Sequence, residues 1–401
     1  MADRDDARAD SSQSTPTGGV LARGVGRADM LPWPLVRASS VFELRYGKAL
    51  VESSRKPGLV PVYGSNGRTG WHDSPLFHGP GVVLGRKGMG NLGVKWVDGD
   101  FWVIDTAYSL DVAHSADLKF AYYLIGYVGL NHLKDGSSNP SLTRETFGAQ
   151  LFPLPPLDEQ RRIAAVLGAL DDLIETDRRA IANVLQLAMT AFSVLTDAKL
   201  DMVRLGDVTT KIGSGATPRG GKGVYQQSGI AFIRSQNVYD GQFAFDGLAR
   251  ISDAAAESLR GVTVILGDVL INITGESVTR TTRVPNRALP ARVSQHVAIV
   301  RPNLNALDPG FLLLALLAAP AKGRLNGLSS AGATRRALTK SHLEDTLIPL
   351  PPLADQHRVS RILDAINGLE EEVADLTRTR DELLPLLMCG KVRVPEDLAV
   401  A

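Results

Sequence analysis

The sequence predicts an α+β fold in which two strand-rich globular blocks alternate with two long helices that pack against each other. Three observations lead to this prediction. A proline-rich segment followed by a helical pattern occurs twice, each copy continues into a narrow apolar seam, and the remaining stretches are rich in Gly, Val, Ile and turn residues. A chain of 401 residues, 44% of them hydrophobic, is long enough for two or three domains with separate apolar cores.

The first observation is an internal repeat, which decides the architecture before any local motif does. The chain reads LFPLPPLDEQRRIAAVLGALDDLIET from Leu151 and LIPLPPLADQHRVSRILDAINGLEEE from Leu347, at an offset of 347 − 151 = 196 residues. Proline lacks an N–H and disfavours helix before it, so each copy predicts an extended strand end and then a helix. Acids that suit the helix dipole stand in the first turn, at Asp158, Glu159 and Asp355.

The second observation is that each helical pattern continues as a seam with alternating spacings of three and four. The first seam comprises Ile163, Leu167, Leu170, Ile174, Ile181, Val184, Ala188 and Leu195, and the second comprises Val359, Ile362, Ile366, Leu369, Val373, Leu376, Leu383 and Leu387. Narrow stripes of this kind bury best against each other, with Asp177 and Arg380 as polar interruptions. The first helix, from about Asp158 to Lys199, would be about 60 Å long at ~1.5 Å per residue. The second should weaken at Pro385 and end near Gly390.

The third observation is the strand-like character of the two blocks. Short apolar runs alternate with glycine turns in VVLGRKGMGNLGVKWVDGDFWVIDTAYSLDV and in VTVILGDVLINITGESVTRTTRV. Each block also has a helical candidate before its proline segment, LKFAYYLIGYVGL or PGFLLLALLAAPAKGRL. We therefore expect a disordered tail at 1–29, a block at 30–152, a proline segment and helix at 153–200, a block at 201–348, a proline segment and helix at 349–392, and a tail at 393–401.

Composition narrows the class of protein. There is no apolar run near the ~18–20 residues that a membrane helix needs, and FLLLALLAAP has the length of a buried helix. The single cysteine, Cys389, excludes a disulfide framework and a thiolate metal cluster, which fits a cytoplasmic protein. The formal net charge is +1, but residues 201–345 hold 17 Lys and Arg against 11 Asp and Glu. The stretch 277–307 holds five arginines and no acid, which indicates either a solvated face or a phosphate-binding surface.

The sequence contains only weak matches to known catalytic and nucleotide-binding motifs. GMGNLG at Gly88 satisfies GxGxxG, but the strand-like VKWVDGDFWVID follows it where a dinucleotide site needs a helix. GSGATPRGGKG at Gly213 lacks the GxxxxGK spacing and has Gly223 where a phosphate-binding loop has Ser or Thr. The seven histidines show no HExxH spacing, and GxSxG and (D/N)PP(Y/F) are absent from the sequence. These motifs indicate neither a catalytic site nor a metal site, and an enzyme without a recognisable motif stays open at this point.

The doubled PLPPLxxQ followed by a long helix resembles the specificity subunits of type I restriction–modification systems. PVYGSNGRTGWHD and GPGVVLGRKGMGNLG in the first block, and GSGATP, AFIRSQNV, DVLINITGESVTR and VSQHVAIVRP in the second, support the resemblance. It implies two target-recognition domains, each reading half of a split DNA sequence, joined by two antiparallel helices. It also implies that this subunit is not catalytic and binds no cofactor. The implied partners are double-stranded DNA, two methyltransferase subunits and restriction/translocase subunits, with no membrane.

Base reading needs Arg or Lys for guanine, Asn or Gln for adenine, and hydroxyls for either, on loops that reach a groove. The candidates in the first block are Tyr63, Ser65, Asn66, Arg68, Arg86, Lys87 and Asn91, and those in the second are Arg234, Ser235, Gln236, Asn237, Thr274, Arg280, Arg283, Gln295 and His296. We expect about half of them to be ordinary loop residues or phosphate contacts. Gly64, Gly85 and Gly275 are expected to shape turns.

Two other functions stay open at this point. One is a coiled-coil scaffold with two protein-interaction domains, which would show no sequence-dependent DNA binding. The other is an enzyme that uses GSGATPRGGKG as a nucleotide loop, which would bind nucleotide as an isolated chain. Neither explains why the helical frame occurs twice while the blocks diverge.

Overall fold

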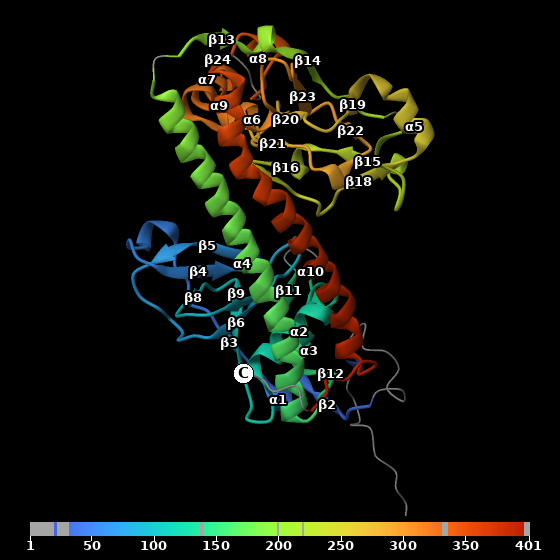
Figure 1. Ribbon diagram of the computed structural model, residues 1–401. Helices are drawn as coiled ribbons and strands as arrows, with labels where there is room; N and C mark the ends of the chain where they lie inside the picture. The colour runs from blue at the N-terminus through green and yellow to red at the C-terminus, as the bar shows by residue number, and fades with distance from the viewer. Residues whose placement is uncertain are drawn as a thin grey trace, which may run out of the picture. The chain divides into compact units, whose positions relative to one another are not determined.

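The computed structural model describes residues 20–21, 32–136, 140–198, 200–218, 220–330 and 336–396 (Figure 1). Contacts divide the chain into two units, Met1–Ile174 with Ala374–Ala401 (unit 1) and Glu175–Val373 (unit 2). The predicted N-terminal tail lies outside the described residues except for β1 (Val20–Leu21), which pairs in parallel with Gln150 and Leu151.

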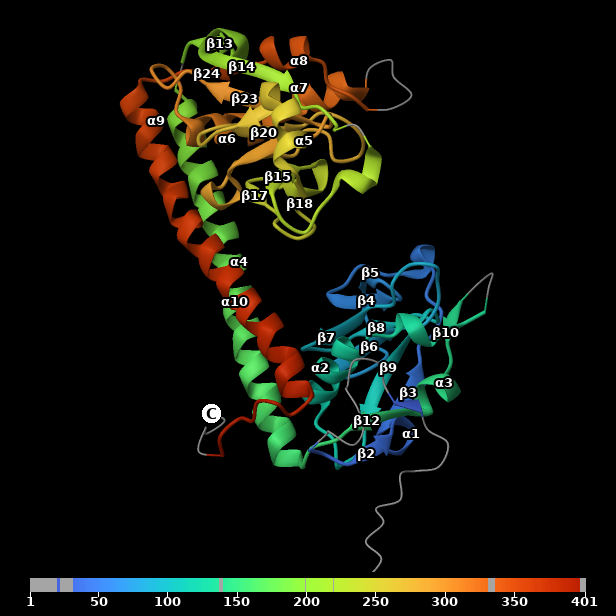
Figure 2. The same ribbon diagram turned by 90° about the vertical axis from the view of Figure 1, so that its right-hand side faces the viewer.

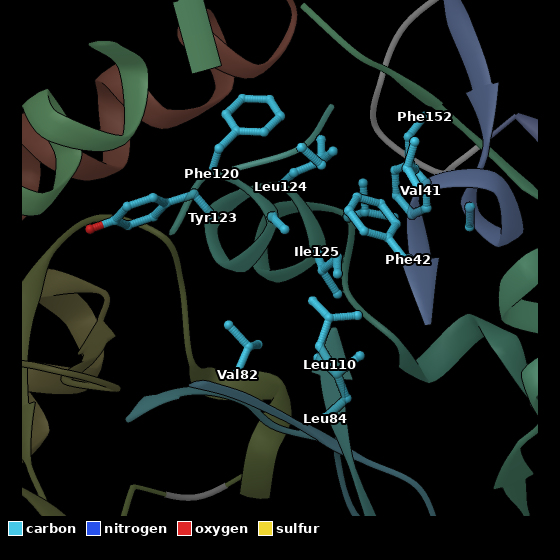
Figure 3. Packing of buried hydrophobic residues seen from close by; sticks show 14 of the residues in the cluster. Val41, Phe42, Val82, Leu84, Leu110, Phe120, Tyr123, Leu124, Ile125 and Phe152 are labelled. Atoms are coloured by element: carbon cyan, nitrogen blue, oxygen red, sulfur yellow. The ribbon is translucent and has the colours of Figure 1, made fainter. Parts of the chain in front are cut away.

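Unit 1 is built on an antiparallel sheet that one helix covers. The sheet has the order β3 (Phe42–Tyr46), β9 (Ala107–Val112), β6 (Gly81–Gly85) and β7 (Val94–Val97), and the covering helix is α2 (Leu118–Val128). Figure 3 shows Ile125 of α2 pointing toward Leu110 and Leu84 of the sheet. A smaller sheet of β5 (Gly67–His72), β4 (Val60–Gly64) and β8 (Trp102–Val103) has its own cluster around Phe77 and Phe101.

Unit 2 repeats the strand order of both sheets and adds one strand to the second sheet. Its main sheet has the order β14 (Thr209–Ser214), β23 (Val297–Pro302), β20 (Val269–Asn272) and β21 (Thr281–Arg283), under α6 (Pro309–Leu317). The second sheet has the order β18 (Ala249–Ile251), β15 (Ile230–Ile233), β22 (Ala291–Val293) and β19 (Thr263–Val264). Strand β15 pairs in parallel with β22 as β4 does with β8. The two blocks therefore differ in sequence but share one fold.

Shorter elements complete each unit. Unit 1 adds β2 (Leu35–Arg37), α1 (Ala38–Val41), β10 (Lys134–Asp135), β11 (Ser141–Leu142), α3 (Arg144–Gly148) and β12 (Gln150–Pro153). Unit 2 adds β13 (Met202–Arg204), β16 (Val238–Tyr239), β17 (Gln242–Phe243), α5 (Asp253–Ser258), α7 (Ala319–Ser330), α8 (Lys340–Glu344) and β24 (Leu347–Pro349). Strands β12 and β24 confirm the predicted extended segment before each long helix.

The first long helix is α4 (Leu157–Thr196), 40 residues without a break, as the seam predicts. The second consists of α9 (Leu353–Ser360), a 3₁₀ turn at Arg361–Leu363 and α10 (Asp364–Met388). Helix α10 continues through Pro385, where we expected weakening, because Leu387 and Met388 beyond it are buried in the unit 1 core. It ends as predicted near Gly390, whose φ is +68°.

The two seams face each other within each unit, and both views show α4 and α10 side by side (Figures 1 and 2). In unit 1, Ile163 and Leu167 share the core with Leu387. In unit 2, Ile181 and Ala188 share a core with Val359, Leu363 and Ile366. By length and composition α4 could cross a membrane. Its seam residues Ile163, Leu167, Ile181 and Ala188 are buried in these cores, and Leu170, Val184 and Leu195 are partly exposed.

The seam interruption at Arg380 has a partner. Its guanidinium Nη1 lies 2.9 Å from Asp171 Oδ1 on α4, and Tyr123 Oη donates to Asp171 Oδ2 at 2.7 Å. Burial and the neighbouring carboxylate raise the pKa of Tyr123. A polar pair at a seam position specifies the register of two helices, so Arg380 fixes how α10 lies along α4 in unit 1.

The expected C-terminal tail is partly packed. Val394 is buried in the unit 1 core, and Arg393 Nη1 lies 3.0 Å from Glu159 Oε2. Trp33 Nε1 donates to the same carboxylate oxygen at 3.1 Å. Glu159 is therefore a structural anchor as well as an acid in the first helical turn.

Candidate nucleic-acid interface

Three chain segments converge at one edge of unit 1. They are the turn after β4 with Ser65 and Asn66, the loop from Arg86 to Gly93 between β6 and β7, and the pair Asp105–Thr106 before β9. Ser65 Oγ donates to Thr106 O at 2.6 Å and accepts from Lys87 N at 3.1 Å. Arg86 donates from its backbone N to Thr106 O at 2.9 Å. The structure thus brings together four predicted residues: Ser65, Asn66, Arg86 and Lys87.

This edge is polar and positively charged. Asn66 and Asn91 are exposed, whereas Arg86 and Lys87 are partly buried. The Arg86 guanidinium lies 4.8 Å from the ring centroid of Tyr46, and that of Arg144 lies 4.1 Å from the same ring. Tyr46 keeps 49% of its surface exposed, so the stack is open to a ligand. Arg86 Nη1 donates to Asp105 O at 2.9 Å, whereas Arg144 is exposed and can contact phosphate. Sequence reasoning missed Tyr46 and Arg144.

The remaining unit 1 candidates lie on the small sheet. Tyr63 packs against the Phe77 and Phe101 cluster, and burial raises its pKa. Arg68 is exposed on β5, with its guanidinium 4.5 Å from the ring centroid of Trp71.

Unit 2 gathers its candidates at the equivalent edge. Thr274 Oγ1 lies 2.7 Å from His296 Nδ1, and Ile273 N donates to His296 O at 3.0 Å. Asn272 Nδ2 donates to Ser235 O at 2.9 Å, which ties the segment after β15 to β20. The edge therefore carries five predicted residues: Ser235, Gln236, Thr274, Gln295 and His296.

Two further arginines of unit 2 flank this group. Arg234 Nη2 donates to Gly247 O at 2.7 Å, and the Gln236 amide donates to the same oxygen at 3.2 Å. Arg280 lies 4.7 Å from the ring centroid of Tyr239, which is 43% exposed.

Asn237 and Arg283 do not lie on this surface, and we no longer propose them for base reading. Asn237 is fully buried: its Oδ1 accepts from Arg234 N, and its Nδ2 donates to Ala244 O. Arg283 lines a cavity of 550 Å³ between β21 and the second long helix, and burial lowers its pKa. The reason is strand alternation, which turns Arg283 to the face that carries α6.

The acid-free stretch 277–307 is not a single basic surface. Arg301 makes a bidentate ion pair with the fully buried Asp268, which precedes the stretch, at 2.7 and 2.9 Å. Arg292 Nε donates to Ala256 O at 3.0 Å, and Arg283 faces the cavity. A count along the sequence could not show that these side chains point in different directions.

The glycine motifs are structural. The GMGNLG segment links strands β6 and β7, as the strand-like sequence after it predicts. In GSGATP, a Cβ on Gly215 would lie 2.1 Å from Val293 O, so the segment needs glycine for close backbone approach. Within the described residues, no group of three or more His, Cys, Asp or Glu side chains could hold a metal ion.

Comparison with known proteins gives a consistent result. The family model of the type I restriction modification DNA specificity domain matches residues 30–186 and 198–375. The putative type I restriction enzyme MjaX specificity subunit of Methanocaldococcus jannaschii is 26% identical over 273 residues, spanning 61% of this chain and 59% of that protein. A putative type I restriction enzyme specificity subunit of Haemophilus influenzae is 22% identical, over 82% of this chain and 85% of the relative.

A solved structure shares the fold. The S subunit of a type I restriction–modification system from M. genitalium superposes with a TM-score of 0.57 at 16% identity, covering 91% of this chain and 98% of the other. Because the family model matches most of the sequence in two copies, the chain belongs to the type I restriction modification DNA specificity family.

Proposed function

We propose that this chain reads DNA for a type I restriction–modification complex, with each unit recognising one half of a bipartite site. The observation that carries the proposal is the pair of equivalent edges. Two units of one topology present loops at the same place, but with different polar side chains: Ser65, Asn66 and Lys87 in unit 1, and Gln236, Thr274 and His296 in unit 2. One fold with two sets of side chains can read two different half-sites.

Partner subunits would carry out the methylation and restriction reactions. Methyltransferase subunits, two of them by the pseudo-twofold repeat, would dock on the long helices and supply S-adenosylmethionine, and restriction subunits would supply ATP-dependent translocation. This chain would act without a cofactor of its own, in the cytoplasm with the DNA that it reads. The outward faces of the long helices and the Pro-rich segments before them would be the two equivalent docking places.

The unread gap in the site would depend on the long helices. Helix α4 begins in unit 1 and ends in unit 2 as one continuous helix of 40 residues. At ~1.5 Å per residue it is about 60 Å long, which is more than one turn of DNA at about 34 Å. We propose that this length sets the number of base pairs between the half-sites.

Methylome sequencing tests the proposal. The chain is expressed with its neighbour-encoded methyltransferase subunit in a host that lacks both genes. We expect a split adenine-methylated motif that depends on this chain and disappears on its deletion. A coiled-coil scaffold would leave the methylome unchanged, and purified complex that binds all DNA sequences equally would also contradict the proposal.

A further inference from the structure

The loop between β6 and β7 and the loop between β20 and β21 are equivalent residue for residue. Val82 and Val269 occupy the same place in the two sheets, which gives an offset of 269 − 82 = 187 residues. Gly85 N donates to Gly93 O at 2.8 Å, and Asn272 N donates to Arg280 O at 2.8 Å. The donors Gly85 and Asn272 are 187 residues apart, and so are the acceptors Gly93 and Arg280. Neither loop therefore has an insertion relative to the other.

Each loop also forms hydrogen bonds with a second segment of its unit, residues 140–142 in unit 1 and 336–338 in unit 2, and these bonds match in register. Leu142 N donates to Arg86 O and Leu338 N donates to Ile273 O, each at 2.8 Å. Gly88 N donates to Pro140 O at 3.1 Å, and Gly275 N donates to Arg336 O at 2.9 Å. These pairs make Gly88 equivalent to Gly275. Met89 is therefore equivalent to Glu276.

The two glycines place the next residue at the tip of the loop. Gly88 has φ +123° and Gly275 has φ +77°, conformations that favour glycine. Neither position has another atom within 4 Å of an added Cβ, so the backbone conformation and not crowding requires glycine. The residue that follows is exposed in both loops, and Met89 has 77% of its surface exposed.

Side chains of the same unit hold each loop, at the tip itself in unit 1 and at Thr279, beyond the tip, in unit 2. Lys134 Nζ donates to the carbonyl oxygens of Gly88 at 3.2 Å and Gly90 at 3.0 Å. In unit 2, Asn326 Oδ1 accepts from Thr279 Oγ1 at 3.1 Å and from Arg336 Nη2 at 2.9 Å. A tip with fixed backbone can present a side chain in one geometry, which specific recognition needs.

The chemistry of the tips differs from that of their surroundings. An exposed methionine beside Asn66 and Lys87 adds nothing to phosphate binding, and a glutamate next to an acid-free stretch would be repelled by phosphates. Both residues suit base edges instead. Apolar groups contact the thymine methyl, and carboxylates accept from the cytosine amino group.

We propose that Met89 and Glu276 are specificity-determining residues at equivalent positions in the two half-sites. Met89 contacts a thymine methyl in the half-site read by unit 1, and Glu276 accepts a hydrogen bond from a cytosine amino group in the half-site read by unit 2. This inference rests on the proposed function and names the bases that the two loop tips read.

The test uses the full chain assembled with its methyltransferase subunit, in four variants. Met89→Ala and Glu276→Gln change the tips, and Leu59→Ala and Glu257→Gln change exposed residues elsewhere in the same units. Methylome sequencing and binding to oligonucleotides substituted at each base of the site give the preference at every position. Each tip variant should lose discrimination about tenfold at one position of one half-site, the size of a single base contact. The control variants should match the wild type.

Three results would distinguish a wrong assignment of the loop tips from a wrong proposed function. If both tip variants keep the wild-type preference at every position while bipartite methylation persists, the tips do not read bases and only the further inference fails. If Glu276→Gln tightens binding to all sequences equally, Glu276 faces the phosphate backbone, and its assignment is wrong. If the wild-type complex shows no bipartite methylation, the proposed function itself fails.

Discussion

Gln160 joins the start of helix α4 to the N-terminus of helix α2 through the backbone of Asp117. Its Oε1 accepts from Asp117 N at 2.8 Å, and its Nε2 donates to Pro155 O at 2.8 Å and Ser115 O at 3.0 Å. Gln356 makes the same three contacts in unit 2, with Asp308 N, Pro351 O and Ala306 O at 2.9, 2.8 and 3.0 Å. Both glutamines are fully buried. The glutamine of PLPPLxxQ therefore fixes the angle between each unit's helix and its long helix.

Removing either glutamine should destabilise its unit without changing which bases are read. Gln160→Ala and Gln356→Ala each leave a backbone N–H and two carbonyl groups without their partner, and each should lower the free energy of unfolding by about 2–4 kcal/mol. Urea unfolding measures the loss. Gln186→Ala, at an exposed position of α4, is the control and should be nearly neutral. A changed methylation motif in a folded Gln160 variant would contradict the structural role.

The length of α4 should set the gap in the DNA site. Four residues inserted between Ala180 and Ala191 lengthen the helix by about 6 Å, or about two base pairs at ~3.4 Å each. Methylome sequencing should show a changed gap between two unchanged half-sites. Leu187→Ala, a substitution at an exposed position in the same stretch, should leave the gap as it is. An unchanged gap in the insertion variant would show that α4 is not the spacer.

Arg280 and Arg283 should behave differently although they are only three positions apart in the sequence. Arg280 stacks on exposed Tyr239, so Arg280→Ala should weaken DNA binding and reduce the salt slope by about one. Arg283 lies in the cavity, so Arg283→Ala should lower the melting temperature and leave the salt slope unchanged. DNA affinity measured across a salt series distinguishes the two. Equal salt slopes for Arg280→Ala and the wild type would remove Arg280 from the interface.

Glu370 should make the stability of unit 2 depend on pH. Burial in the cavity raises its pKa to about 7 from an ordinary value near 4.5, although the Phe243 N–H, Arg283 and Arg287 favour the charged form. A raised carboxyl pKa means that stability is present below about pH 4.5 and is lost as the pH rises through about 7, by about 3 kcal/mol at most. Glu370→Gln should therefore be more stable than the wild type at pH 8. Thermal unfolding from pH 5 to 8 measures this. Parallel pH profiles would contradict it.

Part of the candidate site could be predicted from the sequence. Ser65, Asn66, Gln236 and Thr274 stand in glycine-rich or polar loops between strands, and the structure gathers them at the edges of their units. The prediction that Asn237 reads bases was wrong because the 3₁₀ turn Ser235–Asn237 points its side-chain amide inward, where it donates a hydrogen bond to the Ala244 carbonyl. Tyr46 and Arg144 were missed because residues so far apart in sequence meet only through the folded sheet.

The sequence by itself determined the architecture. Repetition of PLPPLxxQ, the seams with spacings of three and four, and alternating apolar strands are local signals, and each specifies an element whatever surrounds it. Only the tertiary structure showed that the two blocks share one topology, that Arg283 faces a cavity, and that Met89 and Glu276 occupy one equivalent position. Those relationships depend on strand order and register, which arise from hydrogen bonds between segments that are distant in the sequence.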